Sequence, residues 1–164
     1  MHDFDLSLLR WMRTHGHSPG IEGAAVALGK AGNNGLVWFV LGAVLAVIDS
    51  SRWESWLICA LLGPVAIGLN YGIKLLVKRP RPVLEGLPPL GGAPSSLSFP
   101  SAHATSSFAV ATAMVRVDPA MSAAFLVAIA LSLGRPYLGM HYPSDVLAGA
   151  FIGVALGLIV PLSF

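Results

Sequence analysis

The chain has 164 residues, of which 55% are hydrophobic and only 11% are charged, and its formal net charge is +2. A soluble domain of this length needs more charge to cover its surface, so this composition, with a mean hydropathy of +0.73, indicates an integral membrane protein. The small net charge argues against nucleic acid as a partner, and the single cysteine, Cys59, excludes an intrachain disulfide and a cysteine metal site.

Residues 1–33 predict a preamble that lies at the membrane surface. Residues 3–32 mix apolar side chains with Arg10, Arg13, His15 and Lys30. No apolar run among them is long enough to cross about 30 Å of hydrocarbon. We therefore expect interfacial helices in this part of the chain.

Residues 34–164 predict a helical bundle. Their apolar runs place membrane spans at about 34–49, 55–77, 101–117, 120–136 and 143–162. The proline- and glycine-rich stretch between the second and third spans predicts an irregular loop outside the lipid, where its backbone groups can be solvated. We therefore expect an all-α, polytopic membrane bundle of about five spans, forming one domain over residues 1–164 in the plasma membrane.

The first group of polar residues lies at the end of the second predicted span. The cations there are Lys74, Lys78, Arg79 and Arg81. The helix should end near Lys78, because a residue that precedes a proline is disfavoured in the α region. Taken alone, cations at the end of a span are more typical of a membrane anchor.

The second group opens the third span, where Pro100 precedes Ser101, Ala102 and His103. This pattern predicts a helix start, and the free N–H groups of the last three residues should point outward as an anion site. Taken alone, His103 is more typical of an interfacial histidine than of a catalyst.

The third group joins the fourth and fifth spans and contains Arg135, His141 and Asp145. Pro143 suits the first turn of a helix, which leaves Asp145 in that turn and close to His141. A carboxylate in this place can hold one imidazole nitrogen and make the other more nucleophilic.

Counting the spans places all three groups on one face of the membrane. The second span ends there, the third begins there, the fourth returns there and the fifth leaves from it. If these residues were independent membrane anchors, there would be no reason for two histidines, an acid and several cations to gather on one face. A transporter would place some ionisable groups near the middle of the membrane.

These residues resemble the signature of the type 2 phosphatidic acid phosphatases, relatives of the vanadium-dependent haloperoxidases. The signature joins a lysine, six residues and Arg-Pro, then Pro-Ser-Gly-His, then Ser-Arg, five residues, His, three residues and Asp. This chain supplies Lys74 with Arg81-Pro82, Pro100 to His103, and Arg135 with His141 and Asp145, over roughly residues 55–160. Ala102 replaces the usual glycine and Gly134 the usual serine.

The resemblance implies a role for each residue at the site. Lys74, Arg81 and Arg135 would bind the phosphoryl oxygens together with Ser101 and the N–H group of Ala102. His141 would attack phosphorus to form a phosphohistidine, oriented by Asp145, and His103 would protonate the leaving alkoxide. No cofactor or metal is expected, because fixed cations neutralise the phosphate and no carboxylate cluster exists to hold a metal.

The expected substrate is a lipid phosphate at the membrane face, with membrane lipids around it. The chain is similar to small actinobacterial members of the family that act on decaprenylphosphoryl-5-phosphoribose; undecaprenyl diphosphate and phosphatidylglycerophosphate are the alternative substrates. A noncatalytic lipid-binding membrane protein is the competing class of function. Gly149, Gly153 and Gly157 offer either a homodimer face or close packing inside the bundle, the commoner outcome.

Overall fold

The computed structural model describes residues 2–92 and 96–163 of the chain. These residues form seven α-helices with three short 3-10 turns and no strand, which confirms the expected all-α class. The helices are α1 (His2–Thr14), α2 (Pro19–Ala31), α3 (Leu36–Ile48), α4 (Trp53–Val77), α5 (Ala102–Val117), α6 (Ala124–Tyr137) and α7 (Pro143–Ile159).

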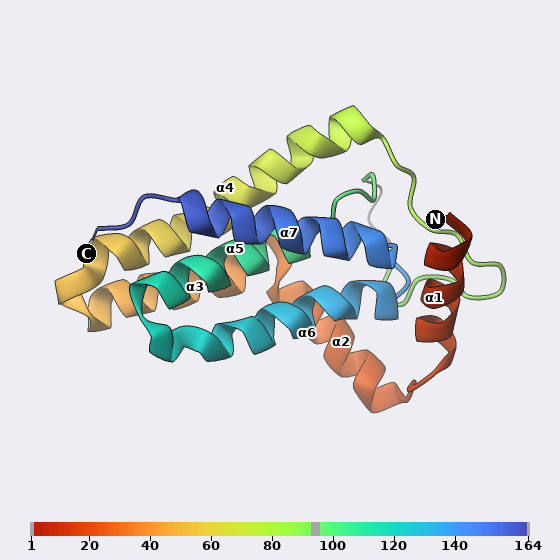
Figure 1. Ribbon diagram of the computed structural model, residues 1–164. Helices are drawn as coiled ribbons and strands as arrows, with labels where there is room; N and C mark the ends of the chain where they lie inside the picture. Colours follow the sequence, from red (N-terminus) through yellow and green to blue (C-terminus); the bar gives the residue numbers. More distant parts are fainter. Residues whose placement is uncertain (1, 93–95, 164) are drawn as a thin grey trace.

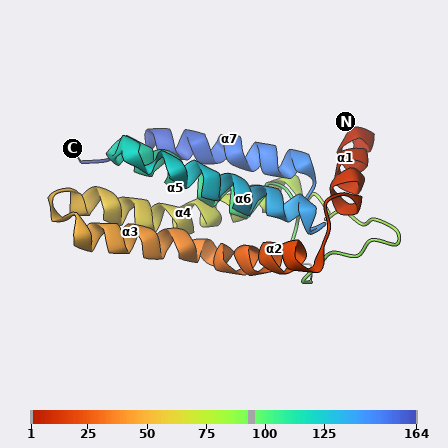
Figure 2. The same ribbon diagram turned by 90° about the horizontal axis from the view of Figure 1, so that it is seen from below.

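Helix α5 lies at the centre of the bundle, between α4, α6 and α7 (Figures 1 and 2). Its sequence is rich in alanine, serine and threonine, and small side chains let the neighbouring helices approach closely. Two of the buried hydroxyls of α5 accept hydrogen bonds from neighbouring helices. Trp38 donates its indole N–H to Ser107 at 2.9 Å, and Asn70 donates to Thr105 at 2.9 Å.

The three glycines of α7 pack directly on the backbone of α5. A Cβ atom at Gly149 would lie only 2.7 Å from the carbonyl oxygen of Ser101, which caps α5, and one at Gly153 or Gly157 would lie 2.5 Å from a carbonyl oxygen of α5. Any larger residue would push the two helices apart. The glycine face is therefore used for close helix packing inside the chain.

The helices that follow residue 34 occupy the positions predicted for the five spans. Not all of them, however, are long enough to cross a membrane. Among the described residues, 50–77 and 119–137 form helices long and apolar enough to cross a membrane. Helices α2 and α3 pass the same test only as a pair, bent by 53°. Helix α2, which we expected to be a separate interfacial helix, packs against α6 and meets α3 at this bend.

Helix α1 lies across one end of the bundle (Figures 1 and 2). Helix α4 ends at Val77, and Lys78 has a left-handed backbone with φ 54°, which confirms the predicted helix end. The irregular loop that follows α4 lies at the same end of the molecule as α1 (Figure 1). This end also contains the start of α7 and the three groups of polar residues.

Candidate active site

Lys74 closes the last turn of α4 and holds the loop that precedes α5. Its ammonium donates hydrogen bonds to the carbonyl oxygens of Leu97 at 2.7 Å and Ser98 at 3.0 Å. The side chain is buried, so its charge acts through a medium that screens it less than water does.

Arg81 connects the loop after α4 to the α6–α7 connection. One of its terminal nitrogens, Nη1, lies 2.6 Å from the Met140 carbonyl oxygen and 3.2 Å from Nε2 of His141. Its Nε donates to the Ser96 carbonyl oxygen at 2.7 Å. The loop thus places the guanidinium of Arg81 next to the ring of His141.

Arg135, near the end of α6, is 5% exposed and only partly satisfied. Its Nη2 lies 2.7 Å from the sulfur of Met140, whereas Nε has no hydrogen-bond partner among the described residues. A buried guanidinium N–H without an acceptor is costly, and a phosphate oxygen is the acceptor that best suits it. Lys74, Arg81 and Arg135 together form the cationic cluster.

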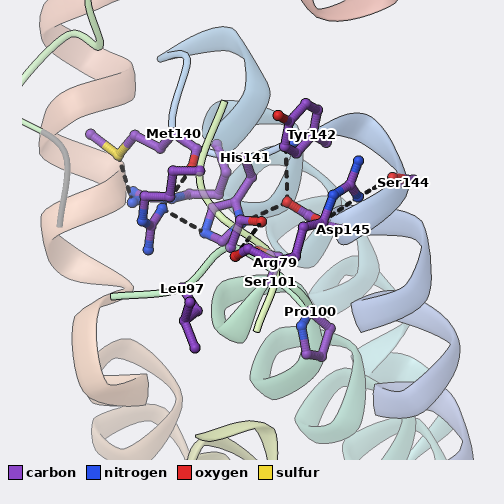
Figure 3. A network of polar contacts seen from close by, with 12 residues as sticks. Arg79, Leu97, Pro100, Ser101, Met140, His141, Tyr142, Ser144 and Asp145 are labelled. Atoms are coloured by element: carbon purple, nitrogen blue, oxygen red, sulfur yellow. Dashed lines mark hydrogen bonds and ion pairs between the residues drawn. The ribbon is translucent and has the colours of Figure 1, made fainter. Parts of the chain in front are cut away.

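His141 and Asp145 form the pair predicted from the sequence (Figure 3). Nδ1 of His141 lies 3.4 Å from Oδ2 of Asp145, which also accepts the backbone N–H of Tyr142 at 3.0 Å. Since a carboxylate only accepts hydrogen bonds, it selects the ring form that carries the proton on Nδ1. The lone pair of Nε2 then faces Arg81 and the cationic cluster.

Burial keeps the ring of His141 neutral. The side chain is 3% exposed, and this burial lowers the pKa of His141 to about 4, although the hydrogen bond to Asp145 acts in the opposite direction. Because a charged imidazole is the disfavoured form, protonation begins only well below pH 6.5, the usual histidine pKa. Nε2 is therefore available as a nucleophile at neutral pH.

This state of His141 predicts a specific pH dependence in ¹⁵N NMR of the histidine-labelled protein. The ring signal that disappears in His141→Gln should keep neutral, Nδ1-protonated chemical shifts from pH 8 to about pH 5. Free histidine in the same buffer, which titrates near pH 6.5, provides the reference. Titration of the His141 signal together with free histidine would contradict the buried neutral ring.

His103, the second residue of α5, is held by helix α2. Its Nε2 lies 2.9 Å from the carbonyl oxygen of Gly29, so Nε2 must carry a proton. The charges of Arg135 and Arg81 both act on this ring. A Cβ atom at Gly29 would lie 2.8 Å from Nη1 of Arg135, which places the same glycine against the cationic cluster.

The start of α5 differs from the expected anion site in one respect. The N–H group of Ser101 does not point outward but donates to the carbonyl oxygen of Asp145 at 3.0 Å, because α7 packs against this end of α5. The first turn closes between Thr105 N–H and the Ser101 carbonyl, so the N–H groups of Ala102 and His103 remain outside the helical pattern. The Ser101 hydroxyl is buried and has no partner among the described residues.

Two further side chains, Arg79 and Asp5, belong to the site although the sequence did not predict them there. Arg79 lies among the cations that, taken alone, are typical of a membrane anchor, yet it donates to Oδ1 of Asp145 at 2.8 Å (Figure 3). It also donates to Asp5 of α1 at 2.7 Å. In the sequence, Arg79 is marked only by its position between a helix end and the first of two prolines. No nearby residue in the sequence links Arg79 to Asp5.

Two cavities border the cationic cluster, one at Arg81 and the other at Arg135. One, of about 650 Å³, is lined by Arg81, Ser96 and apolar residues of the loop after α4. The other, of about 160 Å³, is lined by Gly29, Lys30 and Arg135, with residues of the same loop and of the α6–α7 connection.

The comparisons with known proteins agree with this geometry. The model of the PAP2 superfamily matches residues 53–164. Decaprenylphosphoryl-5-phosphoribose phosphatase from Mycobacterium tuberculosis is 37% identical to the chain over 142 residues, which are 87% of this chain and 80% of that protein.

Two solved structures share the fold. The transmembrane PAP2 type phosphatidylglycerolphosphate phosphatase from Bacillus subtilis has a TM-score of 0.75 and 23% identity, over 96% of this chain and 83% of that one. Aquifex aeolicus LpxE has a TM-score of 0.74 and 25% identity, over 94% of this chain and 92% of that one. The match to the family model and the identity to the mycobacterial relative show that the chain belongs to the PAP2 superfamily and is a phosphatase.

Proposed function

We propose that the protein hydrolyses the phosphomonoester of a polyprenyl-linked lipid phosphate, in the plasma membrane, through a phosphohistidine on His141. The observation that carries this proposal is the arrangement of His141, with Nδ1 facing Asp145 and Nε2 facing Arg81. A neutral imidazole aimed at a phosphate-binding guanidinium is placed to attack phosphorus. The noncatalytic alternative is disfavoured, because a chain that only binds lipid has no need of this pairing.

The cationic cluster would bind the three non-bridging phosphoryl oxygens and neutralise their charge. Arg81 would exchange its contact with Nε2 of His141 for a phosphate oxygen, and Nε of Arg135 would gain the acceptor it lacks. The Ser101 hydroxyl and the N–H group of Ala102 add donors at the start of α5. Preorganised donors of this kind stabilise the charge of the transition state without reorganisation.

In the first step, Nε2 of His141 forms a bond to phosphorus while the bond from phosphorus to the ester oxygen breaks. The negative charge of the bound phosphate favours the protonated ring of His103, whose Nε2–H would turn from the Gly29 carbonyl oxygen to the leaving oxygen and transfer its proton there. In the second step, water attacks phosphorus and gives a proton to His103. The electrons of the nitrogen–phosphorus bond return to His141, and inorganic phosphate is released.

The donor set supports catalysis without a metal ion. The described residues contain no group of three or more histidine, cysteine, aspartate or glutamate side chains that can hold a metal. Three cationic side chains instead surround the site of the transferring phosphoryl group, and these supply the charge that a metal supplies in other phosphoryl transfers.

The position of His103 indicates where the leaving alcohol lies. In an in-line displacement the leaving oxygen is opposite the nucleophile, so it faces His103 and therefore Gly29. The cavity of about 160 Å³ on this side is also lined by the polar residues Lys30 and Asn33. This lining suits a hydroxylated or anionic leaving group, such as a sugar, better than a purely apolar one.

The mycobacterial relative is named for decaprenylphosphoryl-5-phosphoribose, a lipid-linked sugar phosphate. We propose this compound as the substrate, because a sugar as leaving group agrees with the polar lining around Lys30 and Asn33. Undecaprenyl diphosphate and phosphatidylglycerophosphate are the competing substrates.

Phosphate release by the purified protein from these three lipids tests the proposal. We expect the highest kcat/KM on decaprenylphosphoryl-5-phosphoribose, no change on addition of EDTA, and no release by His141→Gln. A higher kcat/KM on the diphosphate would identify the alternative reaction. Loss of activity in EDTA, restored by a divalent cation, would show that a metal is required.

A further inference from the structure

Helix α1 lies outside residues 53–164, the part of the chain that the family model matches, yet it contacts the candidate active site. One stripe of α1, at four-residue spacing, faces the protein and consists of Asp5, Leu9 and Arg13, all of which are buried. Arg13 donates to the Pro88 carbonyl oxygen at 2.8 Å and so ties α1 to the loop after α4. The opposite side of α1 exposes Phe4 and Trp11, as expected of a helix at a lipid surface.

Asp5 is 6% exposed, and both of its carboxylate oxygens accept hydrogen bonds. Oδ2 accepts Nη2 of Arg79 at 2.7 Å, and Oδ1 accepts the backbone N–H of Ser144 at 3.0 Å. The Ser144 hydroxyl donates to the same carboxylate. Because Ser144 is in the first turn of α7, Asp5 satisfies one of the free N–H groups at the start of that helix.

Arg79 joins Asp5 to the catalytic pair. Its Nη1 donates to Oδ1 of Asp145 at 2.8 Å, while its Nη2 is held by Asp5, so one planar guanidinium bridges two carboxylates. The guanidinium carbon also lies 3.8 Å from the ring centre of Tyr142, which fixes the plane of the fork. The other oxygen of Asp145 faces His141 (Figure 3).

These contacts form a continuous path from α1 to the nucleophile. With Asp5 present, Arg79 is held at both ends, and the carboxylate of Asp145 has one orientation that serves both Arg79 and His141. Without the Asp5 charge, Arg79 keeps Asp145, the Ser144 hydroxyl at 2.7 Å and the Tyr142 ring as partners, but loses the carboxylate that holds its Nη2. The carboxylate of Asp145, which the Tyr142 N–H still holds at Oδ2, is then less firmly oriented toward Nδ1 of His141.

We propose that Asp5 is a positioning residue for phosphoryl transfer, which acts through Arg79 and Asp145 to fix the ring of His141. The inference rests on the proposed function, with His141 as the nucleophile. It assigns to α1 a part in assembling the active site, in addition to its place at the membrane surface.

The test is the isosteric variant Asp5→Asn, assayed on the same lipid phosphate. We expect kcat to fall about tenfold with KM within about twofold of the parent, because the ring is misaligned while the cationic cluster is intact. Inhibition by orthovanadate, which mimics the transferring phosphoryl group, should weaken by about the same factor as kcat. Inhibition by inorganic phosphate should not change.

Asp3→Asn is the matched control, since Asp3 is exposed on the same helix. It should retain the parent kcat. Arg79→Lys is the second variant, because a lysine keeps the charge but cannot bridge two carboxylates. If the effect of Asp5 passes through Arg79, Asp5→Asn should lower kcat less than twofold when added to Arg79→Lys.

A parent-like kcat in Asp5→Asn would overturn the inference. Equal weakening of vanadate and phosphate inhibition would also overturn it, since that result indicates general disruption of the site. So would a tenfold loss that persists in the Arg79→Lys background. These outcomes leave the proposed function intact as long as His141→Gln is inactive, whereas an active His141→Gln would reject both.

Discussion

Replacing His141 by glutamine is expected to lower kcat/KM by at least about 10⁴-fold, because glutamine has no lone pair able to attack phosphorus. The variant should still bind the lipid phosphate, since the cationic cluster does not depend on the imidazole for its position. Lys74 is held by loop carbonyls, and Arg81 by Ser96 and Met140.

Rapid quenching with a ³²P-labelled substrate checks this result. The parent should accumulate a phosphoenzyme that is stable in base and labile in acid, as expected for a phosphorus–nitrogen bond, and His141→Gln should form none. His17→Gln is the control, because His17 contacts Glu22 and Met12 rather than the cationic cluster. A labelled protein in the His141→Gln reaction would show that another residue is the nucleophile.

The second large effect is expected for Asp145→Asn, which should lower kcat about 10³- to 10⁴-fold. An asparagine side chain can turn its amide N–H₂ group toward Nδ1 of His141 and so favour the ring form protonated on Nε2. The proton would then occupy the lone pair that attacks phosphorus. The substitution also removes the carboxylate partner of Arg79 at Oδ1.

Single-turnover kinetics separate this effect from a loss of binding. Formation of the phosphoenzyme should be slow in Asp145→Asn, while the Ki of inorganic phosphate stays close to that of the parent. Asp118→Asn is the matched control, because Asp118 pairs with Arg52 at 3.0 Å and lies at the other end of α5 from His103. A phosphoenzyme that forms at the parent rate would mean that the carboxylate does not set the ring form of His141.

The sequence predicted the parts of the site that depend on local geometry. Lys74 lies one turn before the end of α4, and Asp145 lies in the first turn of α7, four residues after His141. Such relations follow from helix ends and proline positions, which are visible in the residues themselves. The same reasoning gave Ser101 a free N–H group, and this was wrong because the acceptor, the Asp145 carbonyl, belongs to a distant helix.

The glycine pattern of α7 shows a similar limit. Its four-residue spacing predicts that a partner backbone approaches closely, and that much is correct. The identity of the partner depends on which helix lies opposite, and the structure places α5 of the same chain there. Nothing in the spacing of Gly149, Gly153 and Gly157 distinguishes this arrangement from a second copy.

The sequence by itself determined the membrane class, the helical order and the gathering of two histidines, an acid and several cations at one end of the bundle. Apolar run length and helix periodicity are properties of neighbouring residues, so they can be interpreted without a fold. Only the tertiary structure decided that Asp5 holds Arg79 and that Gly29 holds His103, two contacts that each join residues 74 positions apart. These contacts exist because α1 and α2 fold back onto the site, and that packing depends on the shape of the whole bundle.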